Sequence, residues 1–300
     1  MFRGFLSIKG LQVKKRQPVF NLPGVILALL AAFVAVQLAR EFVTPQTDAW
    51  IITTFGFIPA RFSQHLAPSG LADAIVRQIA AGVPESTIRW FLGSGGWAWW
   101  TPVTYAFLHG DWMHLGLNGL WLAAFGSAVA RRFGPLRFLG LFVMSGIAGA
   151  AAHLLVHPYG LEPVVGASAA ISGAVAAAMR FAFEPGAPLG PGRNLSVASD
   201  RAYCRPALPL VRVFRDGRAL TFLLTWFGCN ILFGAFATPL GIGDATVAWE
   251  AHIGGFLAGL FAFSLFDPTP DQRPIVEPAT GSAEFDTSAS SQASGPRQVP

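Results

Sequence analysis

The stretch Val165-Gly166-Ala167-Ser168-Ala169-Ala170-Ile171-Ser172-Gly173 lies in a run of small and apolar residues that is long enough to cross a lipid bilayer. A serine hydroxyl in such a run normally donates a hydrogen bond to its own helix and takes part in no chemistry. It becomes a nucleophile only where a base takes its proton and where donors stabilise the oxyanion formed after attack. The fold and the function therefore depend on what the rest of the chain brings to Ser168.

The composition indicates a membrane protein. Hydrophobic residues make up 53% of the 300 residues and charged residues 12%, about half of the roughly 25% that is usual in a soluble domain. The nine Trp and 26 Phe suit apolar helices with aromatic side chains at the membrane interfaces. The sequence shows no soluble basic face, so nucleic acid is not expected as a partner. We expect an all-α polytopic membrane protein with the lipid bilayer as its solvent.

Six apolar runs are long enough to be transmembrane helices. They cover about Leu22–Leu38, Asp111–Ala130, Leu136–Val156, Val165–Phe183, Leu220–Ala237 and Val247–Phe266. A basic segment, residues 1–21, precedes the first run, and no small-residue cleavage site follows it, so we expect an uncleaved helix rather than a signal peptide. The membrane domain then covers residues 22–267, and the polar tail, residues 268–300, is expected to be disordered.

The connections between these runs differ sharply in their Lys and Arg content. Basic residues are concentrated in the N-terminal segment, in the connection after the second run (Arg131, Arg132 and Arg137) and in the Arg-rich loop 184–219. The connections 157–163 and 238–246 contain neither Lys nor Arg. Because Lys and Arg mark the cytoplasmic side of a membrane protein, the pattern predicts six crossings with both termini in the cytoplasm.

The long connection 39–108 then lies on the outer side. It carries four arginines, but long outer segments are translocated largely regardless of charge. It mixes aromatic and apolar stretches with a helical pattern over Leu71–Ala81, and it contains Trp97, Trp99 and Trp100. We expect this loop to lie on or partly in the outer leaflet, with these tryptophans as interfacial anchors.

The predicted topology places several polar residues in one layer. The second, fourth and sixth runs all cross from outside to inside, so their first residues lie at the outer face. Four polar residues follow these starts closely: His114 and Asn118 in the second run, Ser168 in the fourth and His252 in the sixth. At ~1.5 Å per residue, all four lie within roughly 10 Å of the helix starts. Polar groups in lipid are costly and usually functional, so we expect one water-accessible site.

The spacing of small residues predicts which helices meet. Gly255 and Gly259 form a small-residue face on the sixth run, and the fourth run is equally small-sided. Such faces let two helix backbones approach closely, which would bring His252 within ~2.6–3.2 Å of Ser168, as a serine–base pair requires. His114 and Asn118 share one helix face, and His109 precedes a plausible N-cap, Asp111. The histidines at 65, 153 and 157 are expected to be interfacial.

Three motifs resemble those of the rhomboid intramembrane serine proteases. They are Gly166-x-Ser168, His109-x4-His114-x3-Asn118 and Ala251-His252-x2-Gly255-x3-Gly259, within a resemblance that covers about Leu22–Phe266. The resemblance implies a six-transmembrane-helix rhomboid-like bundle of the bacterial type. It also implies that Ser168 is the nucleophile and His252 the general base. The same resemblance assigns the oxyanion hole to His114, Asn118 and the Ser168 backbone N–H, with His109 in support and with Gly166, Gly255 and Gly259 in helix packing.

The same resemblance implies the setting of the reaction. The expected substrates are transmembrane proteins that enter from the lipid and are cut near the outer, periplasmic face of the cell's inner membrane. No cofactor and no metal are expected. Two positions depart from the common pattern of the family. Ala169 stands where glycine is usual, and Ser172 stands where many members carry an aromatic residue that supports the histidine ring.

Other functions are possible on the same scaffold. The first alternative is a catalytically weak or inactive rhomboid-like protein that binds or chaperones transmembrane helices. A transporter or channel would need charged residues or broken helices at mid-membrane, and the sequence contains neither. A zinc metalloprotease of the common kind would need a His-Glu-x-x-His motif, which is absent.

Overall fold

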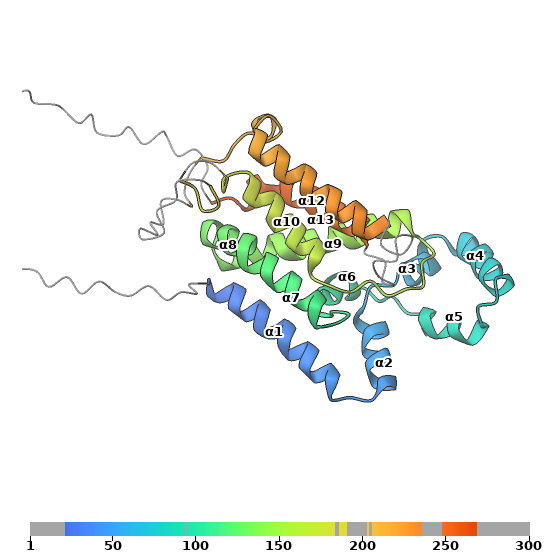
Figure 1. Cartoon of the computed structure of the whole chain (residues 1–300). Coiled ribbons are helices and arrows are strands. Elements are labelled where there is room, and N and C mark those ends of the chain that lie inside the picture. Colours follow the sequence, from blue (N-terminus) through green and yellow to red (C-terminus); the bar gives the residue numbers. More distant parts are fainter. Residues whose placement is uncertain are drawn as a thin grey trace, which may run out of the picture. The chain divides into compact units, whose positions relative to one another are not determined.

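The structure, a computed structural model, describes residues 22–93, 95–183, 186–190, 203, 206–235 and 248–268. The described chain is helical apart from loops and one isolated antiparallel bridge between Phe57 and Val164. Its α-helices (Figure 1) are α1 Gly24–Glu41, α2 Pro45–Phe55, α3 Pro59–Leu66, α4 Pro68–Ala80, α5 Glu85–Leu92, α6 Thr101–Thr104, α7 Trp112–Trp121, α8 Ser127–Phe133, α9 Pro135–Val156, α10 Ser168–Met179, α11 Leu210–Val213, α12 Gly217–Ala235 and α13 Trp249–Phe266. A 3-10 turn, Tyr105–Phe107, and a π-helical turn, Leu122–Gly126, complete the list.

Each of the six predicted runs contains a helix. In the described part of the chain, four helical spans are long and apolar enough to cross a membrane: α1, the continuous stretch Trp112–Phe133, α9 and α13. The apolar helix α10 is shorter, with 12 residues. Six crossings and the cytoplasmic position of both termini therefore stay predictions. The expectations for residues 1–21, for most of loop 184–219 and for the tail lie outside the described residues.

Local sequence signals explain where two of the long helices begin. Asp111 is confirmed as the N-cap of α7, because its Oδ1 accepts a hydrogen bond from the His114 backbone N–H at 2.7 Å. Gly134 ends α8 with a φ of +78°, a conformation that glycine adopts without strain. Pro135 then begins α9 at the position where a helix needs no backbone donor.

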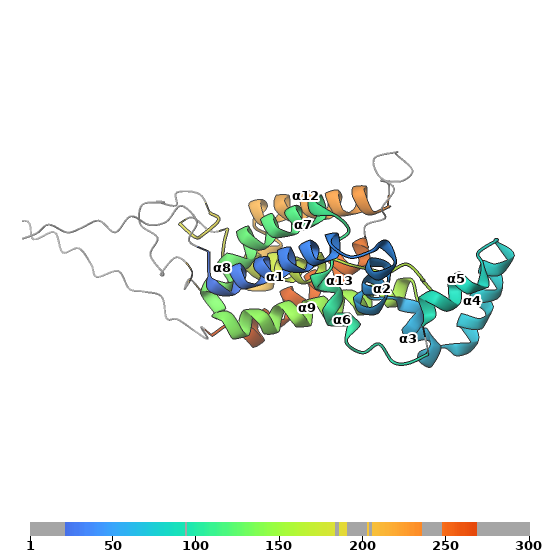
Figure 2. The same ribbon diagram turned by 90° about the horizontal axis from the view of Figure 1, so that it is seen from below.

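Helix α10 is the centre of the membrane domain. It packs against α9 and α13, which also pack against each other (Figures 1 and 2), and its residues from Ala169 to Met179 are all buried. A Cβ built on Gly255 would lie 2.0 Å from the Ala169 carbonyl oxygen, and one on Gly259 would lie 2.1 Å from the Gly173 carbonyl oxygen. Only glycine therefore allows the backbones of α10 and α13 to touch at these two positions.

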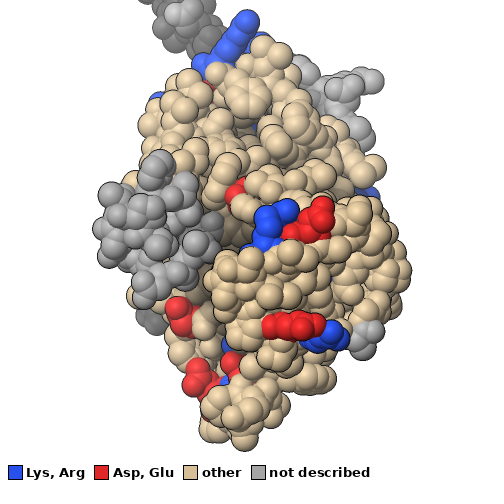
Figure 3. All heavy atoms as spheres, turned by 90° about the vertical axis from the view of Figure 1, so that its right-hand side faces the viewer, with Lys and Arg blue, Asp and Glu red and all other residues tan. Residues whose placement is uncertain are grey.

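The long connection between α1 and α7 is mostly helical. It contains α2 to α6, and the predicted helix over Leu71–Ala81 corresponds to α4, Pro68–Ala80. Several of its large apolar side chains are exposed, among them Trp50, Trp90, Trp97 and Trp99. Figure 3, which views the molecule from the end where α4 and α5 lie, shows a face with only scattered charged side chains. These features agree with a membrane-associated segment, which stays a prediction.

Candidate active site

Ser168 is the first residue of α10. The apolar run predicts a helix start at Val165, but Gly166 has a φ of +118° and the helix begins only at Ser168. The Gly166 backbone N–H donates to the Tyr105 carbonyl oxygen at 2.9 Å, which holds the loop in front of the helix. The first backbone N–H groups of a helix have no partner within that helix. Ser168 therefore has its own N–H at the positive end of the α10 dipole, where a negative oxygen is stabilised.

His252 reaches Ser168 from the first turn of α13. Its Nε2 lies 2.7 Å from the Ser168 Oγ, within the range of a hydrogen bond. The close approach at Gly255 and Gly259 sets this distance, because it brings the α13 backbone against the start of α10. The two groups are thus arranged as a nucleophile and a base.

Asn230 of α12 contacts the other side of the His252 ring. The His252 Nδ1 is hydrogen-bonded to the Asn230 Oδ1, and the Asn230 Nδ2 donates to the Trp226 carbonyl oxygen at 2.7 Å. Because the amide nitrogen is used for Trp226, the amide oxygen faces the ring and His252 must donate from Nδ1. The Nε2 is then the lone-pair nitrogen, which accepts a hydrogen bond from the Ser168 hydroxyl.

Sequence reasoning missed Asn230, although a signal was available. The search for polar residues covered the starts of the second, fourth and sixth runs. The fifth run crosses in the opposite direction, so its outer end is its C-terminal end. Asn230 is five residues before Ala235, the last residue of α12, and therefore belongs to the same layer as Ser168 and His252. Asn230 would have met the criterion that selected Asn118, a polar amide in an apolar helix.

His114 and Asn118 face the loop in front of Ser168. A Cβ built on Gly166 would lie 2.7 Å from the His114 Nε2 and 3.8 Å from the Asn118 Nδ2. The Gly110 backbone N–H donates to the His114 Nδ1 at 3.4 Å, so the ring proton is on Nε2 and that nitrogen is a donor. The Asn118 Nδ2 donates one hydrogen to the His114 carbonyl oxygen at 3.1 Å, which leaves its second hydrogen for another acceptor.

His109 supports this arrangement from behind. Its side chain is fully buried, and its ring packs against His114 and Phe33 with centroids 5.2 Å away in both cases. Neither ring nitrogen has a hydrogen-bond partner. Burial, together with smaller contributions from the nearby His114 and Arg40, lowers the pKa of His109 to about 4. His109 is therefore a neutral ring that supports His114 by packing.

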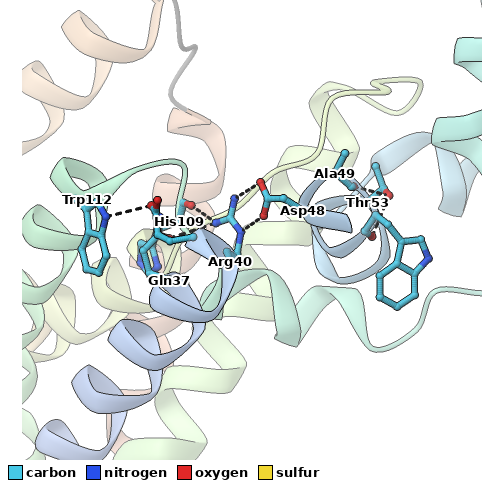
Figure 4. Close-up of polar contacts among 9 residues, drawn as sticks. Gln37, Arg40, Asp48, Ala49, Thr53, His109 and Trp112 are labelled. Atoms are coloured by element: carbon cyan, nitrogen blue, oxygen red, sulfur yellow. Dashed lines mark hydrogen bonds and ion pairs between the residues drawn. The ribbon is translucent and has the colours of Figure 1, made fainter. Parts of the chain in front are cut away.

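Arg40 connects the end of α1 to the loop that carries His109 (Figure 4). Its guanidinium pairs with Asp48 at 2.6 Å and donates to the His109 carbonyl oxygen. Gln37, one turn earlier on α1, accepts a further bond from Arg40 at 3.3 Å. The Arg40 charge is thus neutralised within the protein, which explains how an arginine is accommodated on the predicted outer side.

Ala169 and Ser172, the two positions that depart from the family pattern, have defined contacts in the structure. Ala169 is buried; its methyl group lies beside Gly149, and its backbone lies beside Gly255. The Ser172 hydroxyl donates to the Ser168 carbonyl oxygen at 2.7 Å, as helical serines commonly do. The aromatic support that Ser172 lacks comes from α12, where the Trp226 ring lies 6.5 Å from the His252 ring.

The remaining histidines lie away from Ser168. His65 stacks on Trp97 with centroids 4.2 Å apart, which suits its predicted interfacial position. His153 and His157 instead contact Glu250, a residue in the first turn of α13. The side chain of His153 is only 13% exposed, so it packs within the protein at this end of α9, and its interfacial depth stays a prediction.

Comparisons with known proteins point to one family. Residues 96–191 match the sequence model of the rhomboid domain. Rhomboid protease GluP of Bacillus subtilis (strain 168) is 39% identical over 84 residues, which are 28% of this chain and 16% of that protein. Rhomboid-like protease 3 of Toxoplasma gondii is 27% identical over 175 residues, 58% of this chain and 54% of that protein. RHOMBOID-like protein 5 of Arabidopsis thaliana is 32% identical over 162 residues, 54% of this chain and 42% of that protein.

The aligned segments span about half or less of the length of these relatives. The segment that matches the rhomboid domain contains His109, His114, Asn118 and Ser168, whereas Asn230 and His252 follow it in the chain. The domain match and the relatives agree with the motifs that surround Ser168. Residues 96–191 of this chain are therefore identified as a rhomboid domain.

Proposed function

We propose that the protein is an intramembrane serine endopeptidase that cleaves transmembrane proteins near the outer face of the membrane. The observation that carries the proposal is the directed chain of hydrogen bonds from Ser168 through His252 to Asn230. Each atom in this series of hydrogen bonds either donates or accepts, and the series ends at the Trp226 carbonyl oxygen. This chain of hydrogen bonds activates a serine without a carboxylate as its third member.

The proposed reaction proceeds by acyl transfer. His252 Nε2 takes the Ser168 proton as Oγ forms a bond to the carbonyl carbon of the scissile peptide. The resulting imidazolium protonates the amide nitrogen, the C–N bond breaks, and the amine product leaves an acyl group on Ser168. A water molecule then gives a proton to His252 and attacks the acyl carbon. The bond between the acyl carbon and Oγ breaks, and His252 returns the proton to Oγ, which releases the carboxylic acid product and restores the serine.

Three donors are proposed to stabilise the oxyanion. They are the Ser168 backbone N–H at the start of α10, the His114 Nε2–H and the free hydrogen of the Asn118 Nδ2. Removal of one such donor from a serine protease typically lowers kcat by about 10²–10³-fold. Gly166 makes room for this group of donors, because a side chain at that position would collide with the His114 ring.

The site also defines a substrate class. A peptide must be extended to be attacked, whereas a transmembrane segment is helical. We infer that preferred substrates have small or helix-breaking residues near the cleavage point, since such segments leave the helix at lower cost. The charge distribution of the sequence supports a multi-pass protein of the cell's inner membrane with Ser168 toward the outer side.

The proposal is tested by product release in cells. Membrane proteomes of cells that express the wild type or Ser168→Ala are compared for ectodomains released into the outer compartment. Ser127→Ala is the matched control, because Ser127 is a partly buried serine of α8 whose buried hydroxyl oxygen has no hydrogen-bond partner. We expect fragments that depend on Ser168 and not on Ser127. Identical proteomes from the wild type and Ser168→Ala would instead favour the inactive helix-binding alternative.

A further inference from the structure

A second cluster of side chains lies between the end of α9 and the start of α13. His153 is in the last turn of α9, and His157 follows four residues later, directly after the helix ends. Glu250 is the second residue of α13. The proposed protease mechanism uses none of these three residues.

The three side chains face a common point. The His157 Nε2 lies 2.8 Å from the Glu250 Oε1, and the His153 Nδ1 lies 3.5 Å from the Glu250 Oε2. One nitrogen from each ring and a carboxylate oxygen all lie within 4.8 Å of one another. Ligands in a tetrahedral zinc site bind at about 2.0–2.2 Å and are therefore about 3.3 Å apart. The His157 nitrogen is closer than this to one oxygen of Glu250, and the His153 nitrogen is slightly farther from the other oxygen.

One polar atom of the cluster has no hydrogen-bond partner within the protein. The His153 Nδ1 is buried and has no hydrogen-bond partner, because its distance to Glu250 is too long for one. Glu250 is 8% exposed, whereas His157 is 48% exposed, so the cluster is buried on the helix side and open on the other. A buried nitrogen lone pair that faces a carboxylate needs a cation between them, either a proton or a metal ion.

We propose that His153, His157 and Glu250 bind a divalent transition-metal ion of the zinc class. Two imidazole nitrogens and one carboxylate oxygen form a donor set that suits Zn²⁺. The exposed side at His157 provides the entry path and a fourth position for water. The ion would take no part in the proposed protease reaction. It would connect α9 to α13 beside the serine–histidine pair, because Glu250 is two residues before His252.

The test measures zinc binding directly and does not depend on protease activity. Full-length protein without a histidine tag is purified in detergent, stripped with a chelator and dialysed against micromolar ZnCl₂, and the bound metal is measured by mass spectrometry. We expect one zinc ion per chain. His153→Ala, His157→Ala and Glu250→Gln should each weaken binding by about 100-fold or more, since the loss of a mere outer-shell partner already costs 10–100-fold.

Two variants serve as matched controls. His65→Ala removes a histidine of the outer segment that stacks on Trp97, and His252→Ala removes the histidine nearest to the cluster along α13. Both variants should keep one zinc ion. Zinc that is lost on His252→Ala, or that persists when His153 and His157 are both replaced, would overturn the proposal, as would a wild type that binds no zinc.

A second measurement covers the case in which a ligand variant fails to fold. Cobalt(II) added to the stripped wild-type protein should give the visible absorption bands of a four-coordinate ion, and added zinc should displace them. Zinc should also raise the unfolding temperature of the wild type in a concentration-dependent way, because it binds only the folded state. A wild-type protein with no cobalt bands and no zinc-dependent stabilisation would show that the cluster is a hydrogen-bonded pair of histidines and a glutamate.

Discussion

At the scale of single residues, the serine and the histidine acquire their roles from neighbours that fix their protonation. Ser168 and His252 alone would leave the histidine free to take either tautomer. The Asn230 Oδ1 requires a proton on Nδ1, and Gly110 fixes the opposite tautomer on His114, with its proton on Nε2. The two histidines of the candidate site thus present a lone pair to Ser168 and a donor N–H beside Gly166, as the proposed roles require.

Replacement of Asn230 tests this positioning role. In Asn230→Ala, His252 loses the acceptor that orients its ring, so we expect kcat to fall by about 100-fold, the scale of a small misplacement of a reacting group. KM should change little, because Asn230 is not expected to touch the substrate. The measurement is steady-state cleavage of a transmembrane substrate in detergent or liposomes. Cys229→Ala, which removes the exposed side chain of the neighbouring residue on α12, is the control, and equal kcat values for the two variants would contradict the role.

Replacement of His114 tests the oxyanion assignment. His114→Ala removes the Nε2–H donor that lies beside Gly166. We expect kcat to fall by about 10²–10³-fold with a nearly unchanged KM, since an oxyanion donor acts mainly in the transition state. A variant that loses affinity for the substrate while it keeps its kcat would assign His114 to substrate binding instead.

The buried ring of His109 predicts how stability depends on pH. Its pKa is about 4 in the folded protein and about 6.5 in the unfolded chain. Above pH 6.5 the ring is neutral in both states, and its contribution to stability is complete. As the pH falls from 6.5 toward 4, the unfolded chain binds the proton first, so the stability of the folded state decreases.

His109→Phe isolates this effect, because phenylalanine keeps a ring against Phe33 and cannot bind a proton. Between pH 7 and pH 5 we expect the wild type to lose about 2 kcal/mol more of its unfolding free energy than His109→Phe does. Reversible unfolding in mixed detergent at the two pH values measures the difference. Parallel losses in both proteins would show that His109 does not titrate in this range.

At the scale of helices, the sequence predicted the long apolar helices better than the residues at which they begin and end. All six apolar runs contain a helix, and Asp111 is the N-cap that its position before His114 indicates. The start of α10 was misplaced because Gly166 is as apolar as its neighbours, and hydropathy contains no information about a positive φ. The short helices α2 to α6 were largely missed, since their apolar residues pack locally and give no membrane-length run.

The contact between α10 and α13 predicts which glycines are indispensable. Gly259→Val would place a Cβ 2.1 Å from the Gly173 carbonyl oxygen, and overpacking of this kind typically costs about 1–3 kcal/mol. We expect a lower unfolding temperature together with loss of activity, because α13 carries His252. Gly228→Ala on α12 is the control, since a Cβ there meets no atom within 4 Å. Equal unfolding temperatures for the two variants would argue against direct backbone contact.

At the scale of the whole membrane domain, the helix contacts agree with the predicted directions of the second, fourth and sixth runs. His252, near the start of α13, meets Ser168 at the start of α10, while Asp267, just past the end of α13, pairs with Arg132 of α8 at 2.8 Å. Arg132 is fully buried. One of the arginines that the charge rule assigns to the cytoplasm therefore also has a structural role, which hydropathy and charge counts do not reveal.

The central claim is that Ser168 is an activated nucleophile, and a fluorophosphonate probe tests it most directly. In the proposed reaction, the Ser168 Oγ forms a bond to phosphorus, the P–F bond breaks, and His252 takes the hydroxyl proton. We predict one probe per chain on the wild type and on Ser127→Ala, located at Ser168 by peptide mass spectrometry. Ser168→Ala and His252→Ala should not be labelled. A folded wild-type protein that stays unlabelled, or whose label lies on another residue, would contradict the account.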